Sequence, residues 1–221
     1  MSLFKNNKHA FWQALVMALI IFWTGIILGV LFENSRINKI EEFYKQSETD
    51  ILDIQLASDI LNAYNFDCNF ALYESISFAD RIYEEAKTLE KYDASNKITE
   101  DMINLHKRYD LLRTILWRNT IMLQEKCPKK VNVVVYLYEY VNPSINTQAK
   151  QIALSKVLLD LKKKHGDKII LIPIAYDTNV KSLSLFREEF SLDKFPVIFI
   201  NQKNKVTELT TIENLEPYLA L

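Results

Sequence analysis

The stretch VNVVVYLYEYVNPSIN, residues 131–146, marks the point where the hydrophobic period of the sequence changes. Its first ten residues are mostly β-branched or aromatic, which predicts a buried strand with both faces covered. The Asn-Pro-Ser that follows predicts a turn, and residues 147–166 return to a helical spacing of apolar side chains. A strand, a turn and a helix in this order begin an α/β unit.

The residues after this helix continue the alternation of strand and helix patterns. They predict a second buried strand at 168–176, a short helix at 183–190, a hairpin formed by 196–201 and 205–209, and a tail helix at 211–221. The resulting order is β-α-β-α-β-β-α. Because a helix joins the first two strands, we expect them to be parallel, and the hairpin adds antiparallel strands.

This order resembles the thioredoxin fold over residues 131–221, about two-fifths of the chain. The most specific motif is Lys-Phe-Pro-Val, in which Phe195 and Pro196 enter a predicted strand and look like the cis-proline motif of that family. The resemblance implies a cis bond at Pro196, which is a conformation that X–Pro bonds reach at low cost. Asp177, just after the second predicted strand, also matches the family pattern.

The turn after the first strand aligns with the Cys-Pro-x-Cys site of the thioredoxin-like family. Pro143 falls where the family has its proline, beside Ser144, whereas Asn142 and Ile145 occupy the two cysteine positions. An amide or alkyl side chain cannot form a thiolate, which excludes dithiol–disulfide exchange at this degenerate site. The chain as a whole is similar to membrane-anchored thioredoxin-like proteins of archaeal type, whose members with intact cysteines would be disulfide oxidoreductases.

The residues upstream of the first strand show three helical patterns, at about 34–64, 68–92 and 98–126. No Gly or Pro lies between positions 30 and 128 to break them. The polar YDASNK, residues 92–97, predicts the turn between the second and third patterns. The sequence therefore predicts a helical arm that ends in an α-helical hairpin.

Cys68 and Cys127 are the only cysteines, one at the start of the second helical pattern and one at the end of the third. Folding the hairpin back at its turn brings both to the same end, which favours a disulfide over two unrelated buried thiols. Such a bridge would close a loop of about 60 residues, contribute about 4 kcal/mol in the chain-entropy account, and agree with an oxidising compartment.

The carboxylates on this arm do not have the spacing of a metal site. His106 and Asp110 share a helix face at i, i+4, but no H-E-x-x-H or Glu-x-x-His pair is present. We therefore interpret them as a solvated helix face and expect no metal. With three glycines in the chain no Gly-rich phosphate loop can form, so no nucleotide cofactor is expected.

Residues 10–32 carry no charge and are almost wholly apolar, which predicts one transmembrane helix. A signal peptide is the alternative, but the run exceeds the usual 7–15 residues and no A-x-A-like site follows. The predicted organisation is a cytoplasmic head at 1–9, the membrane helix at 10–32, a helical stalk and hairpin at 33–127, and a thioredoxin-like domain at 128–221.

The layout of the anchor favours a single-pass protein of the cell membrane, with its N-terminus in the cytoplasm and its C-terminal domain extracytoplasmic, because a short basic head precedes the first apolar helix. Small residues recur on one face of this helix, at Ala14, Ala18, Gly25 and Gly29. Such a face lets two helices approach closely and predicts a homodimer or docking on another membrane protein. Small residues are also common in membrane helices generally, which is the simpler interpretation.

Two functional interpretations remain open. The net charge of −1 gives no basic footprint, so nucleic acid is not an expected partner. In the first interpretation the chain is a binding, scaffold or chaperone-like module, which holds an extended peptide on the surface around Asn142–Ile145 and Phe195–Pro196. In the second it is a thiol–disulfide oxidoreductase, or an inactive relative acting with one, that uses Cys68 and Cys127.

Overall fold

The structure is a computed structural model of the 221-residue chain that describes residues 7–93, 100–127 and 131–220. The chain divides into two compact units, one up to Gln46 and one from Ser47 to Leu221. The centre of the predicted YDASNK turn and most of the predicted N-terminal head lie outside the described residues.

The first unit contains the predicted membrane segment. Helix α1 begins at Asn7 and ends at Ala63, and its stretch Ala10–Phe32 is the one described helix that is long and apolar enough to cross a membrane, with a mean hydropathy of 2.7. None of that stretch is buried by protein. A Cβ added at Gly25 or Gly29 would meet no atom within 4 Å, so the predicted small-residue face is uncovered in the single chain.

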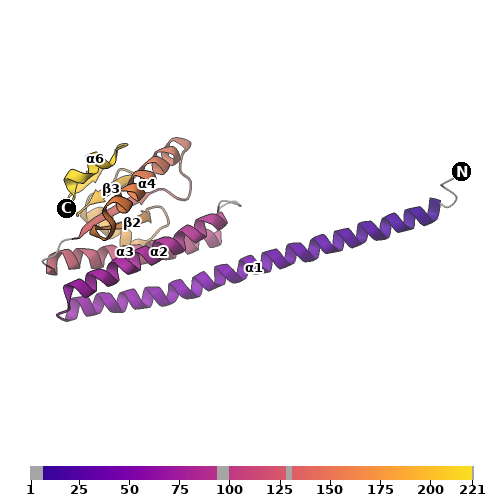
Figure 1. The fold of residues 1–221 in the computed structure, drawn as a ribbon, viewed down its shortest axis with the longest axis horizontal. Helices are drawn as coiled ribbons and strands as arrows, with labels where there is room; N and C mark the ends of the chain where they lie inside the picture. The colour runs from indigo at the N-terminus through magenta and orange to yellow at the C-terminus, as the bar shows by residue number, and fades with distance from the viewer. Residues whose placement is uncertain (1–6, 94–99, 128–130, 221) are drawn as a thin grey trace. The chain divides into compact units, whose positions relative to one another are not determined.

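The second unit begins with three helical segments, formed by the remainder of α1, by α2 (Cys68–Asp93) and by α3 (Glu100–Lys126). Figure 1 shows α2 and α3 running side by side, as expected for a hairpin. Their buried side chains follow the predicted helical spacing. The buried face of α1 also includes Ser47 and Ser58. Arg118 donates a hydrogen bond to the Ser58 hydroxyl at 2.5 Å, so this buried polar group has a partner.

A four-stranded sheet follows, with strand order β2-β1-β3-β4. The pair β1–β2 is parallel, and β1–β3 and β3–β4 are antiparallel, as the sequence predicts. The strands are β1 (Asn132–Tyr138), β2 (Ile169–Ala175), β3 (Val197–Ile200) and β4 (Asn204–Val206). The remaining helices are α4 (Ile145–His165), α5 (Lys181–Glu189) and α6 (Ile212–Leu215), and the 3-10 segments are η1 (Gly166–Lys168) and η2 (Glu216–Tyr218).

Both faces of the sheet are covered, but by helices from different parts of the sequence. Helices α4 and α6 cover one face, where Leu154 and Leu215 pack with Tyr136 and Ile198. On the other face, Phe199 of β3 meets Trp117 of α3 edge to face, with ring centroids 6.1 Å apart. Trp117 is also stacked on the Phe186 and Phe190 rings at the end of α5, at 4.6 and 5.7 Å.

The helical hairpin, predicted as a segment apart from the C-terminal domain, packs against the sheet of that domain. Tyr109, Leu112 and Trp117 of α3 are at most 1% exposed, and residues from Ser47 to the C-terminus form one compact unit. A sheet with two apolar faces requires two apolar covers, and α3 supplies much of the second one. The hairpin is therefore part of the α/β core, and the term stalk does not describe it.

Candidate functional site

The loop between β1 and α4, residues 139–144, is held in place at both ends. At its start, the Asp177 carboxylate accepts hydrogen bonds from the amides of Tyr140 and Val141, at 2.9 and 2.7 Å. At its end, the Ser144 hydroxyl accepts from the Thr147 amide at 3.1 Å and so caps the N-terminus of α4. Asp177 therefore helps to fix this loop.

The side chains of residues 142–145, which the resemblance aligns with a redox site, are largely exposed. Asn142 and Ser144 are exposed, Pro143 is half-buried, and Ile145, the first residue of α4, is 86% exposed. A large apolar side chain in that position is available for contact with another molecule. Because no thiol lies in this loop, it cannot exchange disulfides.

Pro196 lies at the same end of the sheet as this loop. Strand β3 begins at Val197, which pairs with Leu137 near the end of β1, so the antiparallel register places Pro196 beside the point where β1 ends. The Phe195–Pro196 peptide bond is cis, as the resemblance implies. Phe195 makes no backbone hydrogen bond to any part of the chain that the structure describes.

Phe195 belongs to a stack of two aromatic rings and one guanidinium, formed by Tyr176, Arg187 and Phe195. The two rings lie 3.9 Å apart and nearly parallel, at 15°. The guanidinium carbon of Arg187 is 4.7 Å from the Phe195 ring centre and 5.2 Å from that of Tyr176, within cation–π range. We call these three residues the aromatic–arginine stack.

The electrostatics of the aromatic–arginine stack leave a hydrogen-bond donor and a positive charge available. Burial is the main cause that raises the pKa of Tyr176, with smaller contributions from Glu139 and Asp177, so its hydroxyl stays protonated at neutral pH. Arg187 makes no ion pair with any residue that the structure describes, and its Nε is buried without a hydrogen-bond acceptor. This arginine can therefore pair with a carboxylate from outside the chain.

Helix α3 reaches the same end of the sheet from the other side, and here one prediction is wrong. His106 and Asp110 do not form a solvated face; they are 3% and 0% exposed. The His106 ring is stacked on Tyr140 with centroids 3.8 Å apart. Asp110 accepts hydrogen bonds from the Ala175 amide at 3.0 Å and the Thr178 hydroxyl at 2.7 Å, so it satisfies polar groups where β2 ends.

Sequence reasoning missed this pair because each residue alone is compatible with a surface position. The sequence did contain a signal of their burial. His106 and Asp110 each directly follow an apolar residue of the buried face of α3, Leu105 and Tyr109. No group of three or more His, Cys, Asp or Glu side chains within the described residues is arranged to hold a metal ion.

The disulfide between Cys68 and Cys127 is present, with the two Cα atoms 5.7 Å apart, and the predicted pairing is confirmed. Cys127 is 8% exposed and the bridge packs in an apolar cluster with Leu61, Ala71 and Leu123. The neighbouring Lys126 ammonium donates to the backbone carbonyl of Leu61 at 2.6 Å, close to the end of α1. The bridge therefore joins α2 to the end of α3, and the end of α1 is held beside them by Leu61 and the Lys126 hydrogen bond.

No protein-family model, no curated protein and no solved structure matches this chain.

Proposed function

We propose that this chain is a membrane-anchored, thioredoxin-like binding protein without redox activity at its former cysteine positions. In this proposal it holds an extended peptide segment against the β1–α4 loop and the aromatic–arginine stack. One observation carries the proposal. Arg187 is charged, lies over the Phe195 ring next to Pro196, and has no ion-pair partner among the described residues.

The proposed thioredoxin-like fold is supported by topology. The β-α-β-α-β-β-α order, the strand order β2-β1-β3-β4 and the cis-proline at the start of β3 agree with the resemblance found in the sequence. In such a fold the positions of Asn142 and Ile145 would face the proline.

The proposed mode of binding uses groups that the fold leaves unpaired. The backbone of Phe195 has no hydrogen bond to the described residues, so its amide and carbonyl can pair with an extended peptide. Ile145 offers an apolar contact, and Arg187 offers a charge for a carboxylate. We therefore expect the bound segment to be extended and to carry an acidic side chain.

The proposed location is the extracytoplasmic side of a membrane, with Ala10–Phe32 as the anchor. A buried disulfide supports an oxidising compartment. The uncovered face of Gly25 and Gly29 supports contact with a second transmembrane helix, either from another copy or from a membrane partner.

The competing oxidoreductase interpretation requires an accessible, activated thiol. The burial of Cys127 in an apolar cluster favours a structural role for its bridge with Cys68 instead. An insulin-reduction assay on the full chain in micelles separates the two, because we expect no turnover.

Binding is tested with the full chain in lipid nanodiscs. Peptides selected from a random library are labelled, and their Kd is measured by fluorescence anisotropy against Ile145→Asp, Arg187→Met and the matched control Ile152→Asp. Ile152 is another exposed isoleucine of α4, at 66%, but lies two turns away from the loop.

We expect Ile145→Asp and Arg187→Met each to weaken binding about tenfold, equivalent to about 1.4 kcal/mol, and Ile152→Asp to leave it unchanged. Peptides in which the acidic residue is replaced by its amide should lose the dependence on Arg187. Selected peptides that bind equally well to all three variants would reject this surface as the binding site.

A further inference from the structure

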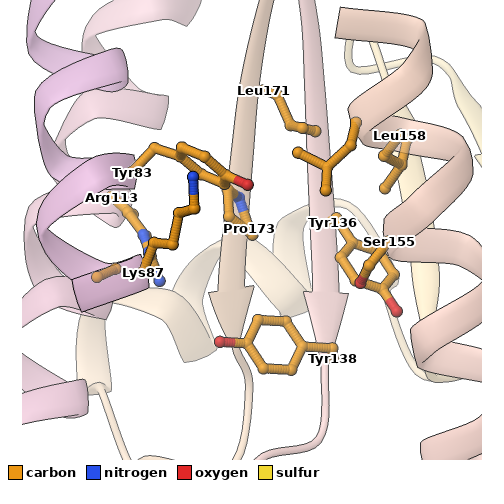
Figure 2. Close-up of a pocket in the computed structure, with 11 residues that line it drawn as sticks. Tyr83, Lys87, Arg113, Tyr136, Tyr138, Ser155, Leu158, Leu171 and Pro173 are labelled. Carbon is orange, nitrogen blue, oxygen red and sulfur yellow. The ribbon is translucent and has the colours of Figure 1, made fainter. Parts of the chain in front are cut away.

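A cavity lies on the opposite face of the sheet from Trp117, where α2, α3 and α4 approach strands β1 and β2 (Figure 2). It has a volume of about 200 Å³. Figure 2 shows Tyr83, Lys87 and Arg113 on one side and Ser155 and Leu158 on the other, with the strands between them. None of the proposed peptide contacts lines this cavity.

The strands give the cavity a largely apolar floor. Tyr136 and Tyr138 project from β1 with their rings stacked, 5.7 Å apart and at 20°. Pro173 of β2 pairs with Tyr136 in the register and, with Leu171, extends the floor. Burial raises the pKa of Tyr136 to about 12, so this phenol is neutral at physiological pH. Such a floor suits a planar apolar group.

The charge of the lining is positive. Arg113 and Lys87 both line the cavity, and no Asp or Glu does. The Arg113 side chain is only 6% exposed, and burying a cation is costly unless it is paired. Lys87 stands at the solvent side, 52% exposed, with Glu84 at 3.5 Å.

Asp110, the carboxylate nearest to Arg113 among the described residues, accepts no hydrogen bond from the guanidinium. Asp110 Oδ1 is 3.6 Å from Arg113 Nη1, which is beyond hydrogen-bond distance. The Asp110 oxygens instead accept from the Ala175 amide and the Thr178 hydroxyl. Within the described ranges Arg113 has no closer acceptor, so its donors remain available to a ligand in the cavity.

We propose that this cavity binds a small organic anion, with a carboxylate at Arg113 and Lys87 and a flat apolar body on the Tyr136 and Tyr138 rings. The volume corresponds to about seven waters at about 30 Å³ each, which is sufficient for one aromatic ring bearing a carboxylate. The planar guanidinium donates two parallel hydrogen bonds to a carboxylate, and this geometry favours that group.

The test uses the full chain in zwitterionic micelles and four probes of similar shape: benzoate, phenyl phosphate, neutral benzamide and cationic benzylamine. Binding is measured by isothermal titration calorimetry. We expect benzoate to bind at least about tenfold more tightly than benzamide, which corresponds to the loss of one charge-assisted interaction, and benzylamine not to bind. Tighter binding of phenyl phosphate than of benzoate would replace carboxylate by phosphate as the preferred group and overturn the proposal.

Two variants connect binding to this cavity without removing the buried Arg113. Lys87→Met should weaken benzoate about two- to fivefold, as expected for a half-exposed ion pair. Ser155→Leu should fill the cavity and abolish binding. The matched control is Lys163→Met, because Lys163 is also a surface lysine with an i, i+3 carboxylate, Asp160, at 3.5 Å, yet lies outside the cavity.

The proposal is overturned if benzoate does not bind, if benzamide binds equally well, or if Lys87→Met and Lys163→Met have the same effect. It is also overturned if Ser155→Leu binds benzoate as the unaltered chain does, provided that the variant keeps its circular dichroism spectrum. A variant that loses this spectrum is replaced by Ala86→Leu, which fills the same cavity from α2.

Discussion

Replacing Trp117 by Ala tests whether the helical hairpin is part of the α/β core. Trp117 is 0% exposed and contacts the aromatic rings of Phe186, Phe190 and Phe199, so it connects α3 to α5 and β3. If the hairpin were an independent stalk, this substitution would affect only α2 and α3. If the fold from Ser47 to the C-terminus is one unit, β1 and β3 must lose stability as well.

The expected magnitude follows from the environment of the indole ring. Truncating a buried Trp to Ala typically costs about 3–5 kcal/mol, and three aromatic neighbours place Trp117 toward the upper end. The indole N–H has no hydrogen-bond partner in the described residues, so its removal returns about 1 kcal/mol or more. The net expectation is a loss of about 3 kcal/mol. Trp117→Phe keeps most of the packing and removes the unpaired donor, so it should cost much less.

The assay is hydrogen exchange with mass spectrometry on the full chain in micelles. A loss of about 3 kcal/mol raises exchange rates by about 100-fold in every segment that opens only by unfolding of the unit. We expect this rise in peptides covering β1 and β3 as well as in α3. Phe70→Ala, at a ring that is 66% exposed, serves as the control. Unchanged exchange in β3 after Trp117→Ala would refute the single-unit fold.

Three further outcomes are expected. Replacing Cys68 and Cys127 by Ala should lower the free energy of unfolding by about 4 kcal/mol, since the bridge closes a loop with a sequence separation of 59. The loss is measured by urea unfolding, and a clearly smaller loss would contradict the entropic account. Burial raises the pKa of Asp110 in the folded chain above its unfolded value near 3.8. The contribution of this carboxyl to the free energy of unfolding is therefore greatest below that value and is lost as pH rises through the folded pKa. As the pH is lowered from 7 to 4, the unaltered chain should therefore gain stability relative to Asp110→Asn. Parallel plots of the free energy of unfolding against pH for the two proteins would contradict this expectation. Ile20→Arg should disfavour membrane insertion by about 3 kcal/mol and release the protein on carbonate extraction; continued retention would argue against the anchor.

Much of the architecture was predictable because it depends on local patterns. The uncharged run at 10–32, the helical spacing of α2 and α3, and the buried character of β1 each depend on residues close together in the sequence. The disulfide was also predictable, because a hairpin with one cysteine at each end leaves few alternatives. The alignment of residues 142–145 with a redox site stays a prediction from the resemblance, because nothing about an Asn-Pro-Ser-Ile turn alone indicates thiol chemistry.

The unpredicted features all depend on which surfaces meet across long separations. Arg187 is 11 positions from Tyr176, and their stacking with Phe195 arises only when the chain after α5 returns to the start of β3. The buried Asp110 accepts a hydrogen bond from the backbone amide of Ala175, 65 residues away, which the sequence of α3 alone does not reveal.

Side-chain spacing along single segments was enough to predict an apolar helix of membrane length, two amphipathic helices closed by cysteines, and a β-α-β-α-β-β-α module without thiols. It did not predict that α3 covers the sheet face carrying Phe199, or that Arg113 lines a cavity with no acidic residue; both emerge from the folded chain. The physical reason is that burial and charge pairing are properties of contacts between distant segments, and an apolar stripe does not specify which of several apolar faces it will cover.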